Sequence, residues 1–172
     1  MKRWIAALSL IAGLSQAKDV QVDELKLKIP DTWTQEQVRS SMRKAQFKIP
    51  APDGKADQTG ELVIFHFGVR GGGPVKANID RWIGQFEKDG RKVSQEDGES
   101  TNGKYSLVSI IGTYNKPFGP PFAQQTKPAP GYQMLGAIIN TPNKGNYFLK
   151  FTGPEKTVTA AEKDFKAAIG VK

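Results

Sequence analysis

Cysteine is absent from this sequence of 172 residues, and there is a single histidine, His66. Without cysteine the chain has no disulfide framework, no thiolate nucleophile and no haem attachment through a Cys-x-x-Cys-His motif. A Ser-His-Asp triad or a histidine-based metal site would have to include His66, and the carboxylates do not cluster at the spacing of metal ligands. We therefore expect no cofactor and no metal, and we assign no catalytic residue.

Long hydrophobic runs are also missing, apart from one at the N-terminus. There, Met1-Lys2-Arg3 precedes an apolar stretch from Trp4 to Leu14 and the sequence Ser15-Gln16-Ala17. The stretch is too short for a membrane-spanning helix, which needs about 20 apolar residues. A basic start and small residues at the positions read by a signal peptidase are typical of a secretory signal, although a retained anchor is the alternative. The sequence predicts a cleaved signal peptide at 1–17, one mature domain at 18–172 without a membrane span, and a periplasmic or secreted location.

Acidic residues are missing from the segment between Ser100 and Pro154, although the whole chain has 17 acidic and 25 basic residues. The lysines of this segment are Lys104, Lys116, Lys127, Lys144 and Lys150. On a shared face they would attract anions, whereas scattered lysines would only keep the protein soluble. Export and the lack of a recognition motif argue against nucleic acid as a ligand. The partner we expect is a protein or an anionic component of the cell envelope.

The apolar pattern predicts strands in runs, with one helix after the first run and another at the end. Strands are expected at 42–49, 61–67, 105–114, 133–141 and 147–152, and helices from Pro74 to Gly90 and over 158–169. The segment 18–33 suggests an exposed strand or an ordered arm, 91–102 reads as a polar connection, and 116–131, with five prolines, reads as an irregular loop. Because no regular βαβ alternation is present, we expect an α+β fold with a largely antiparallel sheet.

Four segments carry a resemblance to a known family: Ser41–Phe47, Asn78–Trp82, Met134–Ala137 and Tyr147–Pro154. They resemble the PsbP-like fold family, which includes the extrinsic oxygen-evolving subunit of photosystem II and a Ran-binding nuclear import factor. The chain looks closer still to a group of uncharacterised secreted bacterial proteins. This resemblance implies an antiparallel sheet flanked by helices, an α/β/α sandwich, and a role in docking onto other proteins without common catalytic residues.

The first candidate binding site is the turn Gly71-Gly72-Gly73 before the first predicted helix. Backbone amides at a glycine-rich helix N-terminus can hold an anion, and Arg70 and Lys76 flank this turn. Gly72 and Gly73 would supply the amides. The alternative is that the glycines only let the chain reverse from strand to helix.

The second candidate site is the proline-rich segment 114–132, which presents aromatic and basic side chains. These are Tyr114, Lys116, Phe118, Phe122 and Tyr132. A proline-stiffened loop loses little entropy on binding, so it suits a docking surface. Our leading hypothesis is an exported, non-enzymatic binding or accessory protein of the cell envelope that docks its partner through this segment.

The alternative hypothesis is a small-molecule hydrolase or another enzyme that uses His66 or Asp80 near the triglycine turn. Each residue also has a structural interpretation. His66 alternates with Leu62 and Ile64 in an apolar strand, so it is expected to be hydrogen-bonded within the core or at its rim. Asp80 would complement the dipole of the first predicted helix.

Overall fold

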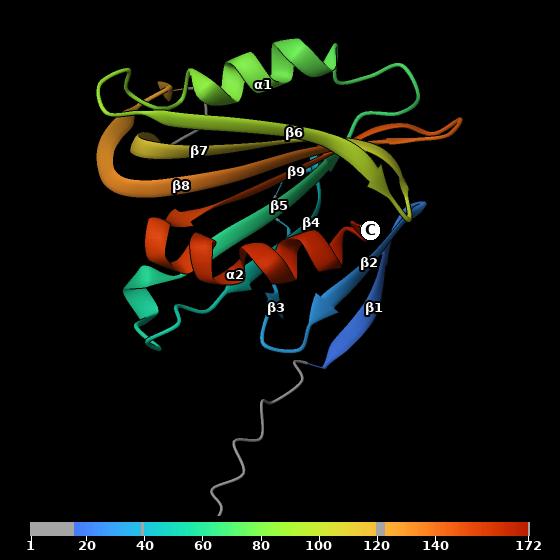
Figure 1. Cartoon of the computed structure of the whole chain (residues 1–172), viewed down its shortest axis with the longest axis horizontal. Helices are drawn as coiled ribbons and strands as arrows, with labels where there is room; N and C mark the ends of the chain where they lie inside the picture. Colours follow the sequence, from blue (N-terminus) through green and yellow to red (C-terminus); the bar gives the residue numbers. More distant parts are fainter. Residues whose placement is uncertain (1–15, 39, 120–122, 172) are drawn as a thin grey trace, which may run out of the picture.

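A seven-stranded antiparallel sheet in the order β3-β4-β5-β9-β8-β7-β6 forms the centre of the protein (Figure 1). The computed structural model describes residues 16–38, 40–119 and 123–171. A separate hairpin consists of β1 (Ala17–Val22) and β2 (Leu25–Pro30). The other elements are β3 (Thr34–Gln35), β4 (Arg43–Ile49), the short 3-10 helix η1 (Ala56–Gln58), β5 (Gly60–His66), α1 (Val75–Ile83), β6 (Lys92–Ser100), β7 (Gly103–Pro117), β8 (Thr126–Thr141), β9 (Gly145–Pro154) and α2 (Glu155–Ala168).

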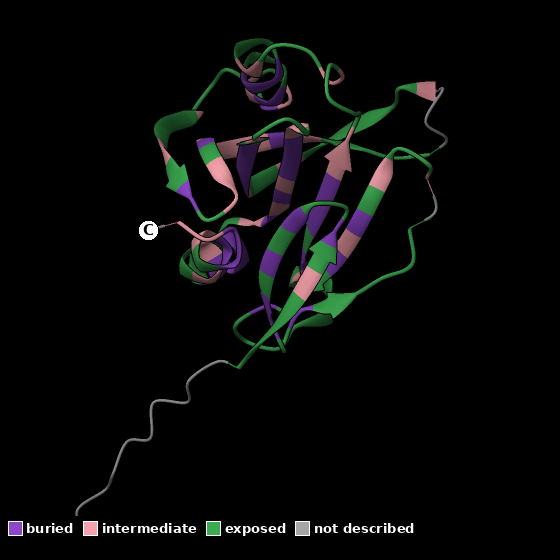
Figure 2. Ribbon diagram, turned by 90° about the vertical axis from the view of Figure 1, so that its right-hand side faces the viewer, coloured by how far each residue is buried: buried purple, intermediate pink, exposed green. Residues whose placement is uncertain are grey.

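The two helices lie on opposite faces of this sheet, each over its own apolar core (Figure 2). Side chains alternate along β5 and β9, so Leu62 and Leu149 enter the core beneath α2 while Phe148 enters the core beneath α1. Trp82 and Phe86, both within the helix predicted from Pro74 to Gly90, are buried in the α1 core. The α+β class and the antiparallel sheet between helices are therefore confirmed.

The segment expected as an exposed strand or arm is instead a hairpin that packs beside α2. Its second strand turns Leu25, Leu27 and Ile29 into the α2 core, where each is at most 2% exposed. The tight turn places Asp23 at a φ of 51°, a conformation that aspartate tolerates better than most residues. The weak alternation of apolar and polar residues in this segment therefore corresponds to a strand with one buried face.

Helix α1 is shorter than predicted, because it ends at Ile83 and not at Gly90. The following residues leave the helix to pair with β7: the amide of Asn115 donates to the Gln85 carbonyl at 2.8 Å, and that of Glu87 donates to the Thr113 carbonyl at 2.9 Å. The Arg91 guanidinium donates to the carbonyl of Ile83 at 3.0 Å, near the helix C-terminus. Tertiary pairing therefore replaces the last predicted turns.

The polar segment 91–102 was also misassigned, because it contains the edge strand β6. Lys92–Ser100 pairs with β7 along its whole length, and only Ser100 is buried. Its charged side chains are typical of an edge strand that must not pair with another chain. Since neither face enters a core, no apolar alternation marks it.

Both ends of the proline-rich segment belong to paired strands and not to an irregular loop, since β7 extends to Pro117 and β8 begins at Thr126. Lys116 pairs with Lys127 and Pro117 with Thr126, after a bulge between Gly112 and Tyr114. Strand β9 pairs with β8 only from position 132 onwards, so residues 126–131 have a free edge. Proline is tolerated there because no ladder hydrogen bond is lost on that side.

Candidate functional site

A groove lies on the part of the sheet face that α1 leaves open. It has a volume of about 440 Å³, and its floor comes from β4, β5 and β9 while β7 and β8 form a wall. We call it the basic groove and define it by Arg43, Lys48, Glu61, Tyr114, Lys116, Tyr132, Lys150 and Thr152. Its volume lies within the range of small-molecule sites.

Lys150 lies in the floor of the basic groove with its amine held by two neighbours. Its Nζ donates to Oε1 of Gln85 at 2.6 Å and to Oη of Tyr114 at 3.1 Å. Partial burial disfavours the charged form and lowers the pKa of Lys150 to about 8. Burial likewise raises the pKa of Tyr114 to about 12, so the phenol stays neutral beside the amine.

Two stacked tyrosines form part of the wall of the groove, and a lysine amine lies near each ring. The rings of Tyr114 and Tyr132 stack with centroids 5.9 Å apart. Lys150 Nζ lies 5.3 Å from the centroid of Tyr114, and Lys116 Nζ lies 5.5 Å from that of Tyr132. These are cation–π distances, which help to hold each amine in place.

Two carboxylates line the groove, those of Glu36 and Glu61, and both are engaged by other side chains: Glu36 Oε2 accepts a hydrogen bond of 2.8 Å from Gln46. Glu61 Oε1 lies 3.3 Å from Nη1 of Arg43, and it accepts a hydrogen bond of 2.8 Å from Gln46. Among the described residues, Lys48, Lys116 and Lys150 have no carboxylate within 4.0 Å. The groove therefore has an excess of positive charge.

The hydroxyl of Thr152 is a further free polar group in the floor. It lies two residues after Lys150 on the same face of β9, its Oγ1 is buried, and it has no hydrogen-bond partner within the described part of the chain. A buried hydroxyl without a partner costs about 1–3 kcal/mol. A ligand or water that accepted or donated a hydrogen bond there would remove this cost.

The structure brings only part of the predicted docking segment into the groove. Tyr114, Lys116 and Tyr132 line it, while Phe118 lies just past the end of β7 with 47% of its surface exposed. Phe122 lies outside the described residues.

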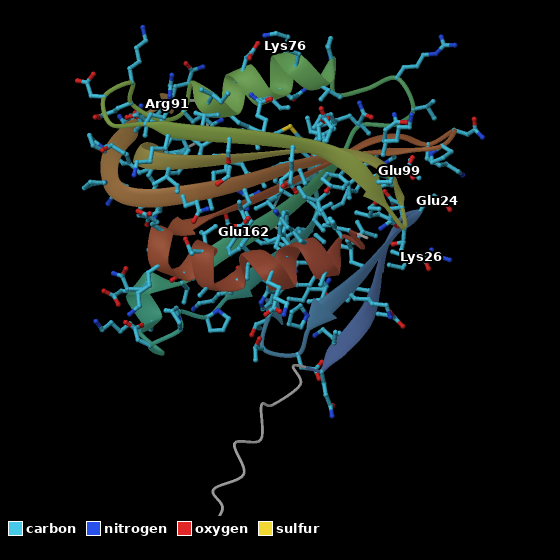
Figure 3. The ribbon with its side chains drawn as sticks, in the orientation of Figure 1. Glu24, Lys26, Lys76, Arg91, Glu99 and Glu162 are labelled. Atoms are coloured by element: carbon cyan, nitrogen blue, oxygen red, sulfur yellow. The ribbon has the colours of Figure 1, made fainter. Side chains whose placement is uncertain are left out.

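The triglycine turn lies beyond the C-terminal end of β5, and Arg70, Gly72, Gly73 and Lys76 are not among the residues that line the groove. Gly72 and Gly73 have φ values of 84° and 75°, so the reversal from strand to helix explains both glycines. Lys76 points away from the sheet and pairs with Asp80 at 2.6 Å (Figure 3).

The residues of the enzymatic alternative lie on opposite sides of the sheet. His66 belongs to the α2 face, where its ring stacks on Tyr147 at 4.1 Å and its Nε2 lies 2.8 Å from the Lys144 carbonyl oxygen. Asp80 lies on α1, and its carboxylate forms an ion pair with Lys76. The structure does not bring the two together into one site, and in the described ranges no group of three histidine, aspartate or glutamate side chains is placed to hold a metal.

The sequence analysis named Lys150 only as one of the five lysines of the acid-free segment, and it did not name Arg43 or Lys48 as candidates. The five lysines of the acid-free segment do not share a face, since Lys144 pairs with Glu24 near the tip of the first hairpin while Lys116 and Lys150 lie in the groove. Lys150 carried a usable signal, because it interrupts the apolar run Tyr147–Phe151 in a strand with two buried faces. No sequence signal marked Arg43 and Lys48, because charged side chains are ordinary in a strand that has the polar pattern of a sheet edge.

Comparison with known proteins supports the fold of this chain and does not identify its function. No family model matches the chain, and no curated protein matches its sequence. Cyanobacterial PsbP (CyanoP) from Synechocystis sp. PCC 6803 is similar in structure, with a TM-score of 0.50, 9% identity and 95% of each chain covered. PA94 from Pseudomonas aeruginosa, a protein of unknown function, has a TM-score of 0.48 and 16% identity over 91% of this chain and 96% of its own. The similarity to PsbP agrees with the resemblance found in the sequence, and such similarity shows the fold alone.

Proposed function

We propose that this protein, whose fold is PsbP-like, is an exported accessory protein that binds an anionic group of a protein or another envelope partner in the basic groove. The observation that carries the proposal is the environment of the Lys150 amine in the floor of the groove. Its amine is partly buried and held at 2.6 Å and 3.1 Å by neutral groups, without a carboxylate within 4.0 Å in the described residues. A buried ionisable group in a concave site is a candidate for binding or catalysis.

The energetics favour an anion at this position. A partly buried ammonium has lost part of its hydration, and a ligand anion can replace it. At an effective dielectric constant of about 20, two unit charges about 4 Å apart attract by about 4 kcal/mol. Lys116 and Lys48 add to this attraction from the wall and the floor.

The hairpin of β7 and β8 supplies the docking part of the proposal. It carries Tyr114, Lys116 and Tyr132 into the groove and exposes Phe118 beside it. An exposed aromatic next to a charged groove suits a partner that inserts an acidic side chain while its neighbours cover the ring. The docking role predicted for segment 114–132 is therefore proposed for the paired strands on either side of its tip, where pairing restricts the backbone.

Export remains part of the proposal and rests on the N-terminal sequence. The basic start, the apolar stretch and Ser15-Gln16-Ala17 support it. Among the described residues, neither helix is long and apolar enough to cross a membrane.

Titration of the purified protein with a poly-glutamate peptide tests the proposal. We expect binding that weakens as salt is raised, and at least a tenfold weaker affinity for Lys150→Met and for Lys116→Ala. A tenfold loss corresponds to about 1.4 kcal/mol. The same variants would then be used to capture partners from the envelope fraction.

Lys104→Ala is the matched control. Lys104 is an exposed lysine of the acid-free segment that does not line the groove, so this variant loses the same charge without touching the site. It should bind like the wild type. Equal binding by all three variants would overturn the proposal, because net charge and not the groove would then explain the affinity.

A further inference from the structure

The amine of Lys150 has two chemical forms: the protonated form is a cation, and the neutral form is a nucleophile. The neutral form of a lysine amine attacks carbonyl carbons, and lysines with a pKa lowered by burial are used in this way. Burial lowers the pKa of Lys150 to about 8, so a larger fraction of this amine than of an exposed lysine is neutral near neutral pH.

The contacts of the amine leave one direction open. Gln85 Oε1 and Tyr114 Oη each accept a hydrogen bond from Nζ, at 2.6 Å and 3.1 Å. A neutral amine has two hydrogens and one lone pair, so these two contacts use both hydrogens. The lone pair then occupies the remaining position of an amine that lines the groove.

The neighbours provide what a carbonyl compound with a negative charge would need. Lys48 and Lys116 line the same groove, have no carboxylate within 4.0 Å among the described residues, and can hold a carboxylate. The Tyr114 hydroxyl, whose pKa is raised to about 12, stays protonated and can deliver a proton to an oxygen beside Nζ. The volume of about 440 Å³ admits a small molecule.

We propose that Lys150 forms a reversible imine with a small oxo-carboxylic acid bound in the basic groove. The inference rests on the proposed function in one respect, since the same positive charges hold the carboxylate. The lone pair of Nζ forms a bond to the carbonyl carbon while the C=O π electrons move onto oxygen, and one proton passes from nitrogen to this oxygen to give a carbinolamine. The second proton of the nitrogen leaves with the oxygen as water, and the nitrogen lone pair then forms the C=N bond, so no oxidant or reductant is needed.

Reductive trapping of the purified mature protein with pyruvate and sodium borohydride tests the inference. Borohydride adds hydride to the imine and makes the adduct permanent, so peptide mass spectrometry can locate it. We expect Lys150 to be labelled about tenfold faster than the exposed lysines near pH 7, because its lowered pKa gives far more neutral amine, offset in part by a weaker nucleophile. Lys150→Arg should lose this adduct, and Lys144→Arg should keep it.

Two outcomes would overturn the inference: an adduct spread evenly over the surface lysines, or unchanged labelling of Lys150→Arg. Lactate separates this failure from failure of the proposed function, because it has a hydroxyl group in place of the carbonyl and cannot form an imine. If lactate and pyruvate bind equally well by calorimetry and no Lys150 adduct forms, anion binding stands and the imine is wrong. If neither anion nor the acidic peptide binds, the proposed function fails as well.

Discussion

The indole ring of Trp82 occupies the space that a side chain at position 136 would need. A Cβ atom built on Gly136 would overlap Cε3 and Cζ3 of Trp82, which is 4% exposed. This contact sets α1 directly on strand β8, in the middle of the α1 face. The distance between helix and sheet at this contact therefore depends on a glycine.

Substitution Gly136→Ala should lower the free energy of unfolding by about 1–3 kcal/mol, because overpacking of a buried contact forces the helix or the ring to shift. Urea denaturation measures the change. Gly84→Ala is the control: Gly84 has a helical φ of −65°, and an added Cβ would meet nothing closer than 3.4 Å. It should be neutral or slightly stabilising, and a similar loss in both variants would contradict the overlap.

Replacement of Lys150 by methionine should stabilise the protein at pH 7 by about 1–3 kcal/mol. The pKa of Lys150 falls from 10.5 to about 8 on folding, and each unit is worth about 1.4 kcal/mol. Below pH 8 the Lys150 amine is protonated in both the folded and the unfolded protein, so the full free-energy cost of burying its charge is present. Between pH 8 and 10.5 only the unfolded state still binds the proton, so the stability of the wild type should rise with pH relative to the variant.

Urea denaturation of both proteins at several pH values measures this difference. A gap between wild type and Lys150→Met that stays constant from pH 7 to 10.5 would show that the amine is not desolvated in the native state.

Alkaline titration should reveal Tyr114 as a late-titrating phenol. Burial raises its pKa from 10.0 to about 12, so the folded state keeps this proton above pH 10 while the unfolded state loses it. The stabilising contribution of the neutral phenol is present below pH 10 and is lost as the pH rises towards 12. Tyr114→Phe should remove the last phenolate step in the ultraviolet titration, and an unchanged curve would contradict the assignment.

Substitution His66→Phe should loosen the tip of the first hairpin without disturbing the sheet. The variant keeps an aromatic ring on Tyr147 but loses the contact of Nδ1 with Asp23 at 3.4 Å and that of Nε2 with the Lys144 carbonyl. We expect a loss of about 1 kcal/mol and faster hydrogen exchange at Glu24, whose amide donates to Tyr147 Oη at 3.1 Å.

The exposed pair of Lys28 and Asp19 offers a control for this experiment. Its side chains are 73% and 87% exposed, so Asp19→Asn should change stability by less than about 0.5 kcal/mol. Unaltered exchange at Glu24 in His66→Phe would mean that other contacts hold the hairpin.

Processing of the full chain in a bacterial host should release a protein that begins at Lys18. Cleavage after Ala17 would leave Lys18–Val22 of β1 paired with β2. Mass spectrometry of the periplasmic fraction measures the new N-terminus. An intact chain that begins at Met1 and stays with the membrane would favour the retained anchor.

Local patterns in the sequence were sufficient for most elements of the fold. Strand β5 could be predicted because Leu62 and Ile64 alternate with Val63 and Phe65, so both of its faces are apolar. The elements that were missed are those whose structure depends on a partner strand. The polar strand β6 forms because it pairs with β7, and α1 ends early because the residues after it pair with β7. The prolines of β8 are tolerated because β9 does not pair with that part of the strand.

The sequence by itself determined the α+β class, most of the strands and the glycine turn before α1, because periodicity and backbone preference act over neighbouring positions. Only the tertiary structure decided the basic groove. Its floor needs β9 to lie between β5 and β8, which brings Lys150 beside Gln85 and Tyr114, residues 65 and 36 positions earlier in the chain. Strand order depends on packing of the whole chain, so no local pattern could have placed that amine in a groove.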